Sequence, residues 1–367
     1  MVDALDWWRF HAPLRFSFKH ASADRSVASS VLVRLRLKNG VNGYGEACPR
    51  AYVTGETEAS VIAFLETHGA AWAQAVGTLD DLSALIASEA TLIDRNPAAF
   101  GALEMAILDA MARAETLSIE ALLSLPPIRN DARYTAVLGD SGALTTGLQG
   151  WVYARAGFRD YKVKLGRDLA RDARRFATLP RGAQVRVDAN NLHDHPDACC
   201  QHLAALNRSV WAIEEPLQPG DVTGQAEVAR RANLRIILDE SLTKQDDLHA
   251  YGEADPALRW IANIRVSKSG GILRSIALAR AAQAMGMDII LGAHVGETSL
   301  LTRTAMTVAQ SLSTPPLARE GAFGRILVMR DICRPSLRFG RSGVLRPGPW
   351  QFDQRYGFGL NMSDEEK

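Results

Sequence analysis

Lysines and acidic residues recur along this chain at nearly equal intervals. The steps between consecutive members are 24, 26, 25, 29, 26 and 26 residues, for the series Lys164, Asp188, Glu214, Asp239, Lys268, His294 and Glu320. One strand followed by one helix occupies about this length, and the strand ends of a parallel β/α barrel all open onto one face. The spacing therefore predicts that these residues meet in one site.

The three acidic members of the series each follow a short apolar run, as expected at the end of a buried strand. One buried carboxylate is costly, but three converging oxygens suit a hard cation, and Mg²⁺ prefers near-octahedral oxygen ligands. We therefore predict a Mg²⁺ site at Asp188, Glu214 and Asp239. For any one of them alone, the alternative is an N-cap of the helix after the strand.

The lysines could act as bases beside such a cation. Lys162 and Lys164 lie two apart and share one face of a strand, so mutual repulsion and the charge of a cation would lower their pKa values. In isolation, Lys-Val-Lys is more simply a solvated strand edge. Lys164 is expected on the second barrel strand and Lys268 at the sixth, on the opposite wall. Two opposed bases beside a cation suit removal and return of an α-proton through an enediolate.

The elements that position these residues fall into three predicted parts. Residues 1–130 predict an α+β domain, since 27–46 alternate as a hairpin around Asn39-Gly40 and the apolar positions of 57–120 have helical spacing. Residues 131–325 alternate strands and helices, the pattern of a parallel barrel. Residues 326–367 predict a segment that returns to the first domain. We expect the loop at 16–25 to close over the substrate.

The bulk composition limits the partners. The 367 residues carry 42 Lys plus Arg against 41 Asp plus Glu, so charge gives no reason to expect nucleic acid or an anionic membrane. No apolar run approaches the ~20 residues of a membrane span. Four cysteines without zinc spacing, and no signal segment at the N-terminus, lead us to expect a cytoplasmic protein. A small-molecule partner is expected, and barrels with apolar helical exteriors often form homo-oligomers.

Five motifs in order carry a family resemblance: Lys-Val-Lys at 162–164, Val-Asp-Ala-Asn at 187–190, Ile-Glu-Glu-Pro at 213–216, Leu-Asp-Glu-Ser at 238–241 and Ser-Lys-Ser-Gly-Gly at 267–271. Together they resemble the enolase superfamily, specifically its muconate-lactonizing-enzyme subgroup, and residues 43–46 and 52–57 are similar to the capping domain of that family. The resemblance implies a modified TIM-type (β/α)7β barrel with an N-terminal α+β capping domain.

The same resemblance assigns roles residue by residue. It implies Mg²⁺, with Mn²⁺ as a substitute, on the three carboxylates, an acid/base pair of Lys164 and Lys268, and Lys162 as a support for the substrate carboxylate and for Lys164. Mandelate-racemase-like members pair a histidine on the seventh strand with an aspartate on the sixth. Because the sixth-strand position here is Lys268, His294 is expected to contact the substrate instead.

The remaining expected substrate contacts are Glu297 and Glu320. Dipeptide epimerases of this kind carry Asp-x-Asp on the eighth strand, whereas this chain has Arg-Glu-Gly at 319–321, which counts against a dipeptide. Muconate-type enzymes carry a Glu followed by Phe-Gly, as Glu320 and residues 323–324 do here.

We therefore expect an isomerase that racemises or epimerises an acid, or an N-acyl amino acid or dipeptide-like carboxylate. The alternatives are a muconate-type cycloisomerase, an o-succinylbenzoate-synthase-type dehydratase and a non-catalytic binding relative. Outside the family, a Schiff-base barrel enzyme could use a strand-end lysine without a metal.

Overall fold

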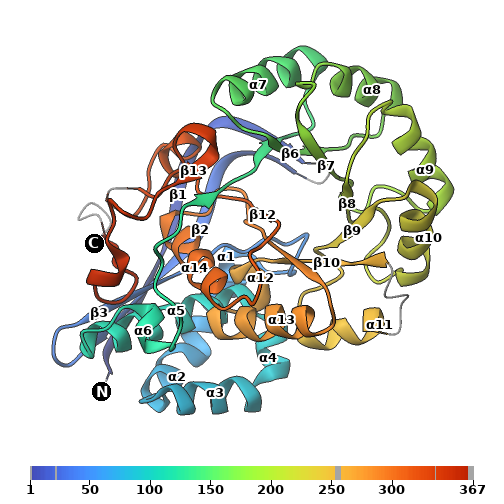
Figure 1. Ribbon diagram of the computed structural model, residues 1–367. Coiled ribbons are helices and arrows are strands. Elements are labelled where there is room, and N and C mark those ends of the chain that lie inside the picture. Colours follow the sequence, from blue (N-terminus) through green and yellow to red (C-terminus); the bar gives the residue numbers. More distant parts are fainter. Residues whose placement is uncertain (1, 21–22, 253–257, 335, 363–367) are drawn as a thin grey trace.

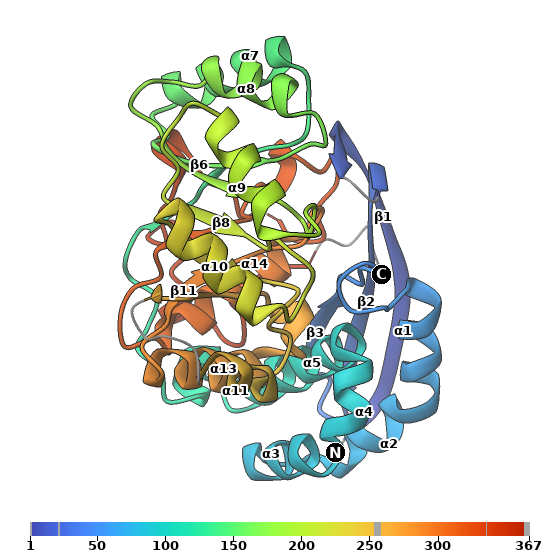
Figure 2. The ribbon, with the colours of Figure 1, turned by 90° about the vertical axis from the view of Figure 1, so that its right-hand side faces the viewer.

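A barrel and a three-stranded sheet with its own helices make up the molecule (Figure 1). The computed structural model describes residues 2–20, 23–252, 258–334 and 336–362. The antiparallel sheet stands along one side of the barrel, and the N-terminal helices gather at its lower end (Figure 2). The predicted α/β fold, a barrel with an α+β capping domain, is confirmed.

The sheet of the capping domain pairs β1 with β2 and β2 with β3, for strands β1 (Val2–His20), β2 (Ala23–Leu37) and β3 (Asn42–Ala47). The predicted turn at Asn39-Gly40 joins β2 to β3. The segment 16–25 is not an irregular loop: its described backbone continues β1 and β2 as a hairpin, with Phe18 opposite Arg25. Residues 21–22 lie outside the described residues.

The helices of the capping domain are α1 (Glu58–Phe64), the π-helix η1 (Leu65–Gly69), α2 (Ala70–Ala75), α3 (Leu79–Ser88), α4 (Ala90–Arg95), α5 (Pro97–Ala114) and α6 (Ile119–Leu122). Helix α5 is buried along most of its length and packs against β3. This approach requires two glycines of β3, since a Cβ on Gly43 would lie 2.1 Å from the Ala106 carbonyl oxygen and one on Gly45 only 1.8 Å from that of Ala102.

Eight parallel strands form the barrel in sequence order: β5 (Ala136–Leu138), β6 (Asp160–Lys164), β7 (Gln184–Asp188), β8 (Ala212–Glu214), β9 (Arg235–Leu238), β10 (Ile261–Ile264), β11 (Asp288–Leu291) and β12 (Ala318–Arg319). The first and last strands meet where the Thr135 N–H donates to the Arg319 carbonyl oxygen at 2.8 Å. Lys164 therefore lies on the second strand, as predicted.

The helices of the barrel are α7 (Ala143–Arg155), α8 (Leu169–Ala177), α9 (Pro196–Ala205), α10 (Val222–Ala232), the 3-10 turn η2 (Gln245–Leu248) with α11 (His249–Gly252), α12 (Val266–Ser269), α13 (Ile272–Ala284) and α14 (Ser299–Gln310). After β12, within the residues that the structure describes, the chain forms only the short turn η4 (Gly324–Ile326) before the C-terminal segment. The barrel is thus of the (β/α)7β type.

A small apolar layer fills the lower part of the barrel, with side chains from Ala212, Ile237, Ile261, Ile290 and Ala318. Two residues further along four of these strands stand Glu214, Asp239, Asn263 and Glu320. Side chains two apart share a face of a strand, so these polar groups form the next layer toward the carboxyl ends. The strand pattern itself therefore places polar groups at the carboxyl end of the barrel.

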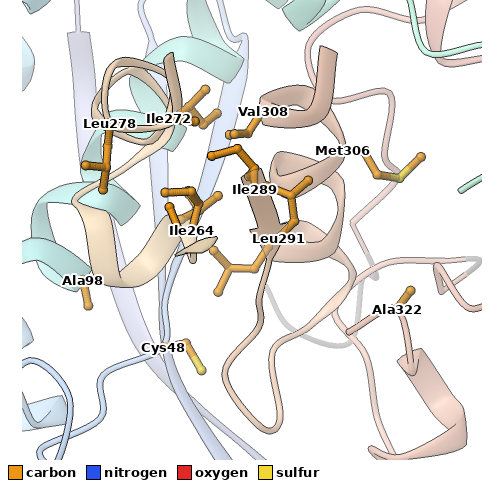
Figure 3. Close-up of a cluster of buried hydrophobic side chains, with 14 of the residues drawn as sticks. Cys48, Ala98, Ile264, Ile272, Leu278, Ile289, Leu291, Met306, Val308 and Ala322 are labelled. Atoms are coloured by element: carbon orange, nitrogen blue, oxygen red, sulfur yellow. The ribbon is translucent and has the colours of Figure 1, made fainter. Parts of the chain in front are cut away.

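A larger core lies between the strands and the surrounding helices. Figure 3 shows part of it, where Ile264 of β10 and Ile289 of β11 lie among Leu278 of α13 and Val308 of α14. These outward residues alternate along the strands with inward ones, and the inward residues of the lower layer are apolar as well, which explains why the strands read as nearly continuous apolar runs. The outer core fixes the strand register and with it the height of the polar layer.

The C-terminal segment contacts residues of both the helical part of the capping domain and the start of the barrel. It includes η5 (Arg341–Gly343), β13 (Val344–Leu345), which pairs with β4 (Ala132–Arg133), and η6 (Phe352–Gln354). The Ile119 N–H donates to the Gly357 carbonyl oxygen at 3.0 Å. The division at residues 130 and 325 stays a prediction. No helix within the described ranges is both long and apolar enough to cross a membrane.

Two carboxylates of the capping domain hold the N-terminal ends of barrel helices. Glu104 of α5 accepts from the Leu273 N–H of α13 at 2.9 Å and from the Ile272 N–H. Glu46 of β3 accepts from the Thr298 N–H at 3.1 Å and from its hydroxyl at 2.6 Å, at the cap of α14. Both carboxylates are fully buried, so they fix the capping domain on the barrel.

Glu104 predicts a pH dependence of stability. Burial raises its pKa to about 7, against the opposing pull of the two backbone N–H donors. Below about pH 4.5 the carboxyl is protonated in both states, and between pH 4.5 and 7 only the folded state keeps the proton. Stability from this group is therefore lost as the pH rises toward 7, by about 3 kcal/mol at most.

The test compares wild type with Glu104→Gln by thermal unfolding between pH 5 and pH 8. We expect the stability of wild type relative to the variant to fall across this range, because Gln has no proton to release. A difference between the two proteins that stays constant with pH would show that the Glu104 carboxyl does not titrate here.

Candidate active site

The three carboxylates predicted to hold the metal stand at the ends of neighbouring strands. Asp188 ends β7 and pairs in register with Glu214, which ends β8. Asp239 follows β9 directly, and all three side chains are at most 1% exposed. The structure thus brings these three residues to adjacent positions at the carboxyl end of the barrel.

Lys162 binds the carboxylates from the centre of the barrel. Its Nζ lies 3.1 Å from Asp188 Oδ2, 2.7 Å from Glu214 Oε2 and 3.2 Å from Glu320 Oε1. Burial lowers the lysine pKa, but the three carboxylates outweigh that effect and raise it above its usual value. Among the protein's own groups this ammonium stays charged at neutral pH. The lowering expected beside a cation stays a prediction.

The carboxylates respond in different ways to the same surroundings. Lys162 and Lys164 outweigh burial and hold the pKa of Asp188 well below its usual range. In the same way Arg265 and Lys268 lower the pKa of Asp239 to about 2. For Glu214 the effect of burial is larger than the attraction of Lys162, and the pKa is raised to about 7.

Two arginines in this layer were not predicted from the sequence. The Arg265 guanidinium contacts Asp239 Oδ2 and lies 3.3 Å from Glu214 Oε1, while Arg186 donates to Glu320 Oε1 at 3.0 Å. Both could have been predicted from the rule that side chains two residues apart share a face of a strand. Arg186 lies two residues before Asp188, and Arg265 lies two residues after the inward Asn263.

Glu215 was also missed and orders the strand ends. It accepts from the Asp239 N–H at 2.5 Å, from the Ser241 N–H at 2.8 Å and from the Ser241 hydroxyl at 2.7 Å. Its backbone φ of 40° lies in the left-handed region, which is unusual for glutamate. Glu215 thus fixes the loop that presents Asp239.

Lys164 lies at the upper end of β6, beside Lys162. Its Nζ donates to Asn190 Oδ1 at 2.8 Å and lies 3.3 Å from Asp188 Oδ2. Asn190 has a left-handed φ of 46°, a conformation that asparagine tolerates, and its N–H donates to Asp188 Oδ1 at 3.1 Å. Asp188 and Asn190 together hold Lys164 at the mouth of the barrel.

Lys268 lies on the wall across from Lys164, four strands away, but not at a strand end. It belongs to the short helix α12, and its side chain is fully buried. Its Nζ donates to the carbonyl oxygens of Asp239 at 2.7 Å and Asn263 at 2.8 Å, and to Asp239 Oδ1 at 3.0 Å. The expectation that Lys268 ends a strand is wrong by one helical turn.

A small cavity of about 60 Å³ opens at the barrel mouth and brings together Lys162, Lys164, His294, Glu297 and Glu320. Lys268, Asp188, Glu214 and Asp239 do not line it. His294 Nδ1 donates to the Cys48 carbonyl oxygen at 2.9 Å, and no described residue bonds its buried Nε2. Burial, together with Arg265, lowers the pKa of His294 well below its usual value, so Nε2 is a free acceptor.

Glu297 and Glu320 differ in their surroundings. Glu297 accepts from the His294 N–H at 2.6 Å, and burial raises its pKa to about 8, so its carboxyl is largely protonated at neutral pH. It precedes α14 rather than forming part of its first turn. Glu320 is held by Lys162 and Arg186, which outweigh burial and lower its pKa.

The described residues contain no group of three or more His, Cys, Asp or Glu side chains arranged as a metal site. The acidic side chains turn instead toward Lys162, Arg265 and Lys268. The donor set still fits Mg²⁺ chemically, since it offers hard carboxylate oxygens at adjacent strand ends. Asp188 Oδ2 and Glu214 Oε2 are buried and close to Lys162, yet no described donor gives either a well-directed hydrogen bond. Both oxygens could therefore accept a cation.

Comparisons with known proteins agree with this architecture. Residues 149–366 match the model of the enolase C-terminal domain-like family, and residues 5–124 match that of the mandelate racemase / muconate lactonizing enzyme N-terminal domain. The chain belongs to the mandelate racemase/muconate lactonizing enzyme group of the enolase superfamily.

Curated relatives of similar length share about a quarter of the residues. An L-Lys-D/L-Arg epimerase of Methylococcus capsulatus is 28% identical over 96% of this chain and 97% of its own length. A chloromuconate cycloisomerase of Cupriavidus pinatubonensis is 28% identical over 96% and 94%. The predicted class, an isomerase of the enolase superfamily, is confirmed by these matches.

The solved structures show the same fold. The crystal structure of an N-succinyl Arg/Lys racemase from Bacillus cereus superposes with a TM-score of 0.86 at 21% identity, over 99% of this chain and 96% of the racemase.

Proposed function

We propose that this enzyme racemises or epimerises a small carboxylate by moving its α-proton between Lys164 and Lys268. The observation that carries the proposal is the placement of two lysines on opposite walls of the barrel, on the second and sixth strand units, with a layer of carboxylates between them. A planar enediolate between two bases can lose a proton on one face and regain it on the other.

Asp188, Glu214 and Asp239 would hold Mg²⁺, with Mn²⁺ as a substitute. The metal, when bound, stabilises the negative charge that develops on the substrate carboxylate. Lys162 stays protonated and adds a fixed positive charge at the same place. Lys164 is positioned by Asn190 to take or give the α-proton at the mouth.

Lys268 must leave two carbonyl oxygens before it can reach a substrate, because its Nζ is bonded to Asp239 and Asn263. This observation favours a second candidate function, in which one lysine transfers the proton and Lys268 acts only by its charge. A muconate-type cycloisomerase or a dehydratase works in that way. The Glu320 position and the cycloisomerase relative point in the same direction.

The cavity favours a substrate with a hydrogen-bond donor near the α-carbon. His294 Nε2 is an acceptor without a partner among the described residues. The Glu297 carboxyl lines the same cavity and accepts from the His294 backbone N–H. The N–H of an N-acyl amino acid or of a dipeptide could donate to His294. We therefore place N-acyl amino acids first among candidate substrates, and dipeptides after them because the Arg-Glu-Gly sequence at 319–321 counts against a dipeptide.

The test incubates the protein with Mg²⁺ in D₂O against N-acyl amino acids, dipeptides, sugar acids and muconates. Mass spectrometry follows α-deuteration, and chiral chromatography follows inversion. Deuteration with inversion supports racemisation or epimerisation. Lactone formation from muconates, without deuteration of the amino acid derivatives, would overturn the first candidate in favour of the second.

A further inference from the structure

A second and much larger cavity adjoins the catalytic one. It has a volume of about 680 Å³ and lies between α7 and the segment that follows β12, with walls from Val137, Leu148, Val152, Tyr153, Phe323 and Leu327. In a full eight-helix barrel a helix would follow the last strand, but in the described part of this segment only η4 does so. The missing helix leaves this groove open.

The groove lies next to the catalytic cavity and shares three wall residues with it. Val137, Phe323 and Leu327 line both spaces. Val137 is the register partner of Lys162 on the neighbouring strand, so it shares the inward face of the barrel. A chain that leaves the catalytic cavity past these three side chains enters the groove.

The catalytic cavity is too small for a whole substrate, whereas the groove is large enough for a bulky substituent. About 60 Å³ has room for only a few water molecules, whereas pockets for small organic ligands have volumes of roughly 300–1,000 Å³. The catalytic cavity is thus sized for the reacting end of a substrate, and the bulk of a larger one requires another space.

The lining defines the chemistry of that second space. Leu148 and Val152 are 64% and 50% exposed, unusually high for aliphatic side chains one helical turn apart. Asp140 and Arg171 at the edge are paired with each other at 2.8 Å, so neither requires a ligand charge. Gln149 also lines the groove, and its buried Oε1 accepts no hydrogen bond from the described residues.

We propose that this groove binds the distal apolar group of the substrate, and that the enzyme prefers carboxylates with a long aliphatic or aromatic acyl or aminoacyl substituent. The inference rests on the proposed function for the position of the reacting carboxylate. Where the substituent is aminoacyl, Gln149 Oε1 accepts from its N–H. Selectivity then comes from α7 and the segment after β12, and not only from the catalytic residues.

The experiment uses the Mg²⁺-loaded enzyme and a series of N-acetyl-, N-hexanoyl- and N-octanoyl-alanine. We expect kcat/KM for α-deuteration to rise by about tenfold or more from acetyl to octanoyl, because each buried methylene favours binding. In Leu148→Arg we expect kcat/KM to be nearly the same for the acetyl and the octanoyl compound. The matched control is Leu144→Arg on the same helix, since Leu144 is 92% exposed and does not line the groove.

Binding is measured in parallel by calorimetry with the same compounds, so that the two proposals can fail separately. Exchange without any dependence on chain length would overturn the groove and leave the proposed function standing. Binding that depends on chain length and is lost in Leu148→Arg, but without exchange of any compound, would support the groove and overturn proton transfer. If Leu148→Arg instead dissociates an oligomer and leaves the ratio unchanged, the groove is a contact between copies of this chain and the inference is wrong.

Discussion

Lys164→Ala is expected to lower kcat/KM for racemisation by about 10³-fold or more, the scale of a lost general base. Lys164 is the acid/base candidate that lines the catalytic cavity, where Asn190 and Asp188 hold its ammonium group. Alanine leaves no group at this position that can take a proton. Chiral chromatography, which follows inversion of the substrate, measures the loss.

The matched control is Lys38→Ala, since Lys38 is an exposed residue near the β2–β3 turn. It should keep the wild-type rate. Thermal unfolding of Lys164→Ala distinguishes a lost base from a lost fold. Near-normal racemisation by a folded Lys164→Ala protein would contradict the proposed role.

Removal of the metal is the second change with a large expected effect. Chelation by EDTA should abolish exchange, and added Mg²⁺ or Mn²⁺ should restore it. Asp239→Asn should lower the affinity for Mg²⁺ by roughly 10–100-fold or more. Losing a residue that only hydrogen-bonds to a metal ligand already has an effect of this size, and Asp239 is expected to be a ligand itself. The reason is that one of three carboxylates at the adjacent strand ends loses its charge. Calorimetric titration with Mg²⁺ measures this without any substrate.

Asp197→Asn is the control for that titration, because the Asp197 side chain is 86% exposed on the surface. It should bind Mg²⁺ as wild type does. Activity that survives EDTA, or Asp239→Asn with unchanged Mg²⁺ affinity, would contradict the metal assignment and revive a Schiff-base mechanism at a strand-end lysine.

Much of the site follows from the regular spacing in the sequence. Steps of 24 to 26 residues correspond to one strand and one helix, and they place Asp188 and Glu214 at strand ends. The single step of 29 is the exception. It ends at Lys268, which lies four residues beyond β10 on α12. The longer step thus corresponds to the position of Lys268 on a helix instead of at a strand end.

The parts that the sequence did not predict depend on contacts between distant segments. The pKa of Lys162 depends on Glu214 and Glu320, which are far away in the sequence. Burial lowers this pKa and the attraction of the carboxylates raises it, so its direction requires the folded structure. In the sequence Glu104 is one acidic residue within a predicted helix. Its contact with the first N–H groups of α13 depends on the tertiary structure, so the sequence alone does not predict it. The groove arises from the absence of a helix, which no motif marks.

The stereochemistry of proton exchange tests the two-base account most directly. Each enantiomer of a racemised substrate is incubated separately in D₂O with Lys164→Ala and with Lys268→Ala. We expect each variant to lose racemisation but to exchange the α-proton of only one enantiomer, a different one for each variant, because each lysine serves one face. Full inversion by folded Lys268→Ala would contradict the account and leave Lys164 as the single base.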